Sequence, residues 1–240
     1  MLAVIGDPVI QATAMAAFHP FGKGGWVRPW ETPGHLDGWG IVKYSPTGPV
    51  CVAHSGGDVD AEGVAYATAS AQAAELFGRL AMVHFRKATR GSICAANSQP
   101  FTEGRWAFCH NGTVTELEKL GPCAPVTDES DSKEFFRRWC LQGQDIARYR
   151  DWIDCVAAAC ANTSLTSLLT NGEQLIACRQ SSGTLCDPAP ANFDPACLQH
   201  SYTLHHWTKD GAHVICSEVL SVFAGEWHNF ANGELMMITV

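Results

Sequence analysis

Residues 83–112 read VHFRKATRGSICAANSQPFTEGRWAFCHNG and contain two short apolar runs that each end abruptly in polar residues. The first run begins at Leu80 and stops before Arg86, and the second, 106–109, stops before His110 and an Asn-Gly pair. Short apolar runs bounded by Gly, Asn and Ser are typical of β-strands. The sequence therefore predicts two strands that hold polar groups at their ends.

These strand ends offer a matched set of hydrogen-bond donors. The guanidinium of Arg86, with Thr89 close by, is a rigid fork that binds a carboxylate through two parallel hydrogen bonds. The side-chain amide of Asn111 and the backbone N–H of Gly112 are neutral donors that can converge on one oxygen, as in an oxyanion hole. A substrate with a free carboxylate at one end and an amide carbonyl at the other would fit both groups.

Each feature also has a purely structural interpretation. Arg86 is equally consistent with a surface cation at a strand end, and Asn111-Gly112 with an ordinary hairpin turn. The two features gain weight because they belong to a longer ordered pattern.

The ordered pattern resembles that of the class II glutamine amidotransferase domain, an N-terminal-nucleophile hydrolase. The resemblance implies an α+β fold with four layers, α-β-β-α, in which two mostly antiparallel sheets pack together, and it covers residues 1–240 as a single domain. Three motifs carry it: His84-x-Arg86-x-Ala88-Thr89-x-Gly91, Asn97-x-x-Pro100 and His110-Asn111-Gly112.

The start of the chain departs from this family. Members begin with a cysteine whose thiolate attacks the amide carbonyl while its own α-amine acts as the base. Met1-Leu2-Ala3 resembles the family opening Cys-Arg-x-Leu-(Ala or Gly) without its first two residues, which predicts a cysteine just upstream of Met1. The alternative is a natural loss, with Leu2 where the cysteine would be. We favour the upstream cysteine because Arg86 and Asn111-Gly112 are still present.

The stretch 127–132, Thr-Asp-Glu-Ser-Asp-Ser, precedes an amphipathic helix predicted over 134–141. Ser130 or Asp131 could serve only as the helix N-cap. The stretch also resembles the family's Ser/Thr-Asp-Ser/Thr element, which implies that Asp131 binds the α-ammonium of the substrate.

Taken over all of these motifs, the resemblance implies one pocket that binds both ends of a substrate: the α-carboxylate and α-ammonium of an amino acid, and its γ-amide. Arg86 and Thr89 would bind the α-carboxylate, Asp131 the α-ammonium, and Asn111 and Gly112 the γ-carbonyl oxygen. The expected function is hydrolysis of the γ-amide of glutamine or of a γ-glutamyl conjugate. The alternative is an inactive homologue that binds glutamine or regulates a partner.

The expected partners follow from composition and from the family. The chain has 240 residues and a net charge of −8, which argues against nucleic acid or an anionic membrane. No apolar stretch reaches the ~18 residues of a membrane span, and no signal peptide is evident, so we expect a cytoplasmic protein. Because the sequence ends with its last expected strand, we expect no synthase domain to follow. If the protein channels ammonia, we expect a synthase subunit as its partner. A stand-alone chain favours hydrolysis of glutamine or of a γ-glutamyl conjugate.

Cysteines are numerous, 11 in all, and many lie within apolar runs. We interpret them as reduced, buried thiols. The spacing of His205, His206, His213 and Cys216 fits no standard zinc pattern, so no metal or cofactor is expected.

The remaining sequence predicts a strand from Met1, a short helix within 11–26, an alanine-rich helix over 61–80 and a hairpin around Asn171-Gly172. The stretch 181–200 is predicted to be a long surface loop that could act as a lid. Three positions depart from the family pattern and bear on the leaving group: Lys87, Gln99 and Lys133.

Overall fold

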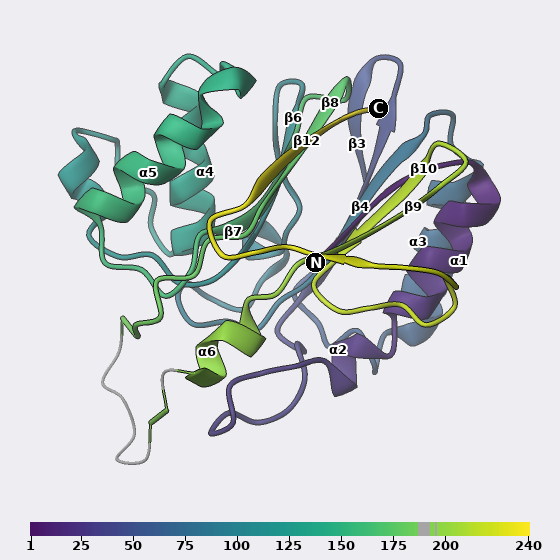
Figure 1. The fold of residues 1–240 in the computed structure, drawn as a ribbon, viewed down its shortest axis with the longest axis horizontal. Coiled ribbons are helices and arrows are strands. Elements are labelled where there is room, and N and C mark those ends of the chain that lie inside the picture. The colour runs from purple at the N-terminus through teal and green to yellow at the C-terminus, as the bar shows by residue number, and fades with distance from the viewer. Residues whose placement is uncertain (187–192, 195) are drawn as a thin grey trace.

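In the computed structural model the chain forms two antiparallel sheets packed face to face between two layers of helices (Figure 1). The structure describes residues 1–186, 193–194 and 196–240. The architecture is the predicted α+β sandwich.

The first sheet has seven strands in the order β11-β9-β10-β1-β4-β2-β3. Their bounds are β1 Leu2–Ile5, β2 Trp39–Ser45, β3 Gly48–Ser55, β4 Leu80–Phe85, β9 His205–Lys209, β10 Ala212–Cys216 and β11 His228–Asn229. The second sheet has five strands in the order β12-β8-β7-β6-β5. Their bounds are β5 Phe101–Glu103, β6 Trp106–Asn111, β7 Thr166–Thr170, β8 Gln174–Cys178 and β12 Leu235–Thr239.

Helices cover the outer face of each sheet (Figure 1). Those beside the first sheet are α1 Pro8–Phe18, α2 Phe21–Gly24 and α3 Gly63–Glu75, and those beside the second are α4 Asp131–Leu141 and α5 Tyr149–Ala159. The remaining helical segments are η1 Ala95–Asn97, η2 Leu117–Leu120, η3 Ile146–Arg148 and α6 Ala196–Ser201.

Strand periodicity decides which side chains face which layer. Alternate residues of a strand point to opposite faces of the sheet. In β1, Leu2 and Val4 pack against α1 and α3, whereas Ala3 and Ile5 pack between the two sheets. Because both faces of β1 are covered, the strand is a continuous apolar run rather than an alternating one.

Most predicted elements are confirmed, including the first strand, β4 and the β7–β8 hairpin. The alanine-rich helix is shorter than predicted, because it ends at Glu75 and Leu76 is already extended. The predicted loop and lid at 181–200 lies partly outside the described residues, and its last part forms α6. None of the described helices is long and apolar enough to cross a membrane.

Candidate active site

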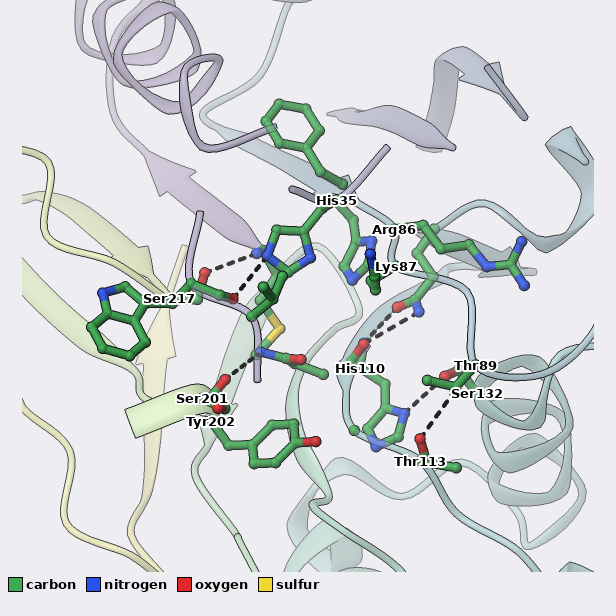
Figure 2. Close-up of a pocket in the computed structure, with 18 of the residues that line it drawn as sticks. His35, Arg86, Lys87, Thr89, His110, Thr113, Ser132, Ser201, Tyr202 and Ser217 are labelled. Atoms are coloured by element: carbon green, nitrogen blue, oxygen red, sulfur yellow. Dashed lines mark hydrogen bonds between the residues drawn. The ribbon is translucent and has the colours of Figure 1, made fainter. Parts of the chain in front are cut away.

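One cavity brings together all five residues predicted from the sequence. Arg86, Thr89, Asn111, Gly112 and Asp131 all line it, and Met1 lines it with them. Figure 2 shows two walls: Arg86, Thr89 and Ser132 lie on one side, and Ser201, Tyr202 and Ser217 on the other. The cavity opens where β4 and β6, one from each sheet, reach their carboxyl ends.

Arg86 follows the last residue of β4 and is almost fully buried. Its Nη1 donates to the Ser92 carbonyl at 2.8 Å, and its Nη2 donates to the Arg90 carbonyl at 2.8 Å. Burial lowers the pKa of Arg86, and the nearby carboxylates of Asp37 and Asp131 oppose that shift. An arginine keeps its charge even so, and the carbonyls hold the guanidinium in one orientation.

Asp37 fixes the backbone that carries Arg86 and Thr89. Its Oδ2 accepts a hydrogen bond from the Ala88 N–H at 2.8 Å, and its own N–H donates to the Arg86 carbonyl at 2.9 Å. The Thr89 hydroxyl lies 3.0 Å from that of Thr113, which follows the Asn-Gly corner. The turn formed by residues 86–91, which we call the arginine turn, is therefore hydrogen-bonded to segments of both sheets.

Asp131 is the first residue of α4, and Ser130 is the N-cap, accepting from the Lys133 N–H. Asp131 is therefore not the N-cap of this helix. Its Oδ2 accepts from the Val114 N–H at 2.8 Å. Burial raises the pKa of Asp131 to about 6, and the Val114 hydrogen bond partly offsets that shift.

Asn97 connects the arginine turn to α4. Its Nδ2 donates to the Ser92 carbonyl at 3.1 Å and to the Asp128 carbonyl at 2.8 Å, and its Oδ1 accepts from the Ser130 N–H at 2.9 Å. One buried amide therefore fixes the position of Arg86 relative to Asp131.

The Asn-Gly corner is not a hairpin turn, because the chain leaves the second sheet after Asn111 and returns to pair with β6 only at β7. Gly112 has φ +153°, and a Cβ there would lie 2.1 Å from the Ser164 carbonyl oxygen. Only glycine fits this backbone. Asn111 donates from Nδ2 to the Ser201 carbonyl over a long 3.4 Å.

His110 anchors the corner from the other face of the sheet. Its Nε2 donates to the Ser164 carbonyl at 2.9 Å, so its Nδ1 accepts from the Ser132 hydroxyl at 2.9 Å. Burial lowers the pKa of His110 to about 4, and the ring is neutral at pH 7. Gln99 adds two hydrogen bonds to the His110 backbone.

The wall formed by α6 and the segment after β10 was not predicted. Tyr202, Ser217 and Glu218 line it. The Met1 amine donates to Ser217 Oγ at 3.1 Å, and Glu218 Oε1 accepts from the Trp26 N–H at 2.8 Å. These side chains belong to no recognisable motif, and only the fold brings them to the cavity.

The histidines considered for zinc form no metal site. His206 Nε2 lies 2.9 Å from His213 Nδ1 and the two rings are stacked. Among the described residues no group of three or more His, Cys, Asp or Glu side chains is placed to hold a metal ion.

Comparison with known proteins gives a consistent result. The family model for class II glutamine amidotransferases matches residues 15–240. Glutamine phosphoribosylpyrophosphate amidotransferase from B. subtilis, solved with ADP and GMP, is similar in structure with a TM-score of 0.61 at 16% identity. That similarity covers 99% of this chain but only 46% of the B. subtilis chain.

Two shorter proteins are similar over nearly their whole length. A predicted glutamine amidotransferase from Pseudomonas aeruginosa has a TM-score of 0.56 at 15% identity, covering 99% of this chain and 96% of that one. A class II domain protein from Silicibacter pomeroyi has a TM-score of 0.54 at 16% identity, covering 100% and 94%. The search of curated proteins found no match. At these identities the structural similarities establish the fold.

Proposed function

Because the chain belongs to the class II glutamine amidotransferase family, we propose that it hydrolyses the γ-amide of glutamine or of a γ-glutamyl conjugate, using a cysteine located two positions before Met1. The family is one of glutamine amide hydrolysis in general. The substrate and the position of the nucleophile are the specific parts of the proposal.

The proposed substrate head fits one wall of the cavity. Arg86 and Thr89 would bind the α-carboxylate, and Asp131 would bind the α-ammonium. The support is that a buried cation and a buried carboxylate line one cavity and are joined through Asn97. Among the described residues their hydrogen-bond partners are neutral backbone groups, because Arg86 donates to the Ser92 and Arg90 carbonyls and Asp131 accepts from the Val114 N–H. An amino acid bound here would neutralise both charges.

The γ-carbonyl oxygen would then lie at the Asn-Gly corner. The Asn111 amide and the Gly112 N–H would stabilise the oxyanion, each donor contributing roughly 3–4 kcal/mol in enzymes where one has been removed. The long contact from Asn111 to the Ser201 carbonyl is weak enough for a substrate oxygen to replace it.

The register of β1 on β4 carries the proposal for the nucleophile. Leu2 pairs with Val83, and each step toward the start of β1 advances one residue along β4. Continued for three steps from Leu2, the strand brings the position two before Met1 level with Arg86. By alternation that side chain would face the second sheet, as Met1 and Ala3 do, and so would point toward Asn111.

The same alternation argues against Leu2 as the replaced nucleophile. Leu2 is fully buried in the core between the first sheet and its helices, on the opposite face from the cavity. Any side chain at that position would point away from Asn111.

In the proposed reaction the thiolate attacks the γ-carbonyl carbon and the carbon–nitrogen bond breaks. The cysteine α-amine accepts the thiol proton and gives it to the leaving amine. Water then hydrolyses the thioester to release glutamate. The opposite wall, with Trp26, Tyr202 and Thr203, offers contacts beyond those needed for ammonia, which supports a γ-glutamyl conjugate as substrate.

The test is an extended chain with Cys-Arg before Met1 and its N-terminal cysteine exposed. We expect this form to release glutamate from glutamine or from members of a γ-glutamyl amide panel, and the matched Ser-Arg form to release none. Absence of release from every compound by the cysteine form would contradict the proposal. Glutamine binding without release would instead favour the inactive binding homologue.

A further inference from the structure

The wall of the candidate active site that faces away from the proposed head-binding groups carries three aromatic rings. Trp26, His200 and Tyr202 all line the cavity. Tyr202 lies across the cavity from Arg86 and Thr89, which are the groups proposed for the α-carboxylate (Figure 2). The rings therefore border the part of the cavity that the amino-acid head of a substrate leaves open.

The Asn-Gly corner adjoins these rings. Asn111 Nδ2 lies 3.4 Å from the carbonyl oxygen of Ser201, and Tyr202 is the next residue. The ring centroids of Trp26 and His200 lie 6.1 Å apart, with 33° between the ring planes. With the γ-carbonyl oxygen at Asn111 and the head on the opposite wall, a substituent on the amide nitrogen extends past Tyr202 and toward Trp26.

Trp26 is held by its backbone while its side chain stays at the surface of the cavity. Its N–H donates to Glu218 Oε1 at 2.8 Å, and its carbonyl accepts from His35 Nε2 at 3.1 Å. Trp26 is nevertheless 58% exposed. A large ring that is exposed on a fixed backbone loses little conformational freedom when a ligand stacks on it, so it is suited to binding.

Lys87 and Glu218 anchor the segment 25–35, which carries Trp26. Lys87 Nζ donates to a backbone carbonyl of this segment at 2.8 Å. Arg28 and Glu31, in the same segment, form an ion pair whose side chains are only 12% and 18% exposed. Opposite charges in contact compensate each other, so this pair exerts little net attraction on a charged substituent. The rings are therefore the groups best placed to recognise the amine part of a substrate.

We propose that the amine part of the substrate carries an aromatic ring, which packs against Trp26 and Tyr202. The inference rests on the proposed function, because it takes a γ-glutamyl amide bound with its head on Arg86 and Asp131. Aromatic rings pair in offset-stacked or edge-to-face contacts, which stabilise a complex beyond the area that they bury. The substrate class is therefore the γ-glutamyl amides of aromatic amines, and hydrolysis with one water yields glutamate and the free amine.

The test is isothermal titration calorimetry of the full chain with glutamine and with three γ-glutamyl amides, the N-methyl, N-benzyl and N-cyclohexylmethyl compounds. The last two have rings of similar size, so they separate aromatic contacts from apolar volume. The benzylamide is expected to bind at least about tenfold more tightly than the methylamide and at least about threefold more tightly than the cyclohexylmethylamide. A cyclohexylmethylamide that binds as tightly as the benzylamide overturns the inference.

Two tryptophans of the segment 25–35 provide a matched pair of variants. Trp30 is also partly exposed, but its ring packs against Phe193 and it is absent from the described residues that line the cavity. Trp26→Leu is expected to reduce the ratio of benzylamide to methylamide affinity at least fivefold, and Trp30→Leu to keep the wild-type ratio. An unchanged ratio in Trp26→Leu overturns the assignment of the ring to this wall.

The titrations also distinguish this inference from the proposed function. If glutamine, the methylamide and the benzylamide bind equally well, the aromatic substituent is wrong while the γ-glutamyl site stands. If neither glutamine nor any of the amides binds, the head-binding groups are wrong and both proposals are overturned.

Discussion

At the scale of single residues, the orientation of Arg86 depends on neutral groups. The acceptors of its hydrogen bonds are backbone carbonyl oxygens, so they fix the guanidinium without neutralising it. Its charge remains available to the carboxylate of a ligand.

Arg86→Lys is expected to weaken glutamine binding at least tenfold, because an ammonium cannot reproduce the two parallel hydrogen bonds of the guanidinium. Isothermal titration calorimetry measures the change. Arg105→Lys, at an exposed arginine that pairs with Glu173, is the matched control and should bind glutamine as wild type does. Equal affinities for all three proteins would mean that Arg86 does not contact the substrate.

The raised pKa of Asp131 leads to a prediction of how glutamine binding depends on pH. Burial raises its pKa to about 6, so the carboxyl becomes protonated below that pH and loses its attraction for an α-ammonium. The dissociation constant should rise by up to about tenfold per pH unit below 6. Burial lowers the pKa of His35 and that of His110 to about 4, so these rings do not explain a change near pH 6.

The measurement is calorimetric titration with glutamine from pH 4.5 to 8. Asp131→Asn should bind weakly at pH 7.5 and show little dependence on pH down to 5. A wild-type profile that is flat between pH 5 and 7 would count against the role of Asp131.

Gly112→Ala is expected to destabilise the protein by at least about 3 kcal/mol, because the new Cβ would approach the Ser164 oxygen and the backbone angle is unfavourable. Gly104→Ala is the control. It also has a positive φ, +56°, but nothing lies within 4 Å of its Cβ position, so it should lose only about 1–2 kcal/mol. Urea unfolding distinguishes them, and equal losses would show that the contact with Ser164 is not tight.

The sequence predicted five residues that the structure places around one cavity, but it did not predict how they are held in position. Asn97 is part of a motif and Gln99 was noted as a departure from the family, yet their structural roles were not predicted, because their hydrogen bonds go mainly to backbone groups. Ser217 and Tyr202 reach the cavity only because β10 pairs with β1 and α6 precedes β9.

At the scale of elements, apolar runs such as β4 were predicted with accurate limits because both faces of those strands are covered. Strand β9 was not predicted, since His205–Lys209 contains two histidines, a threonine and a lysine and has no apolar run. The end of α3 was placed too late because alanine favours a helix, whereas Gly78, with φ +122°, turns the chain into β4.

The burial of Lys43 between the first sheet and α1 leads to a prediction of how the stability of the protein depends on pH. It is fully buried in β2, and its Nζ donates to the neutral Oε1 of Gln11. Burial lowers the pKa of Lys43 to about 8, below its ordinary 10.5. The unfolded chain therefore binds more protons between these values, and stability rises with pH across this window.

Relative to Lys43→Met, the wild-type free energy of unfolding should increase by on the order of 2–3 kcal/mol between pH 7.5 and 10.5. Urea unfolding at several pH values gives this difference. Lys209→Met, at an exposed lysine at the end of β9, should show no comparable change. Parallel curves for wild type and Lys43→Met would mean that Lys43 is solvated.

At the scale of the whole molecule, the cavity lies where strand ends of the first sheet meet a strand end of the second sheet. The first sheet contributes Arg86 after β4 and Met1 before β1, while the second contributes Asn111 at the end of β6. Neither sheet alone holds both the groups proposed for the amino-acid head and those proposed for the amide. The motifs predicted that these residues lie together around one substrate. The part of the cavity wall formed by α6 was not predicted and is seen only in the structure.

The most direct measurement of the central claim is a crystal structure of the chain with L-glutamine bound. The account predicts the α-carboxylate on Arg86, the α-ammonium on Asp131, and the γ-carbonyl oxygen facing Asn111 Nδ2 and the Gly112 N–H. Glutamine bound outside this cavity, or bound with its γ-amide toward Arg86, would contradict the account.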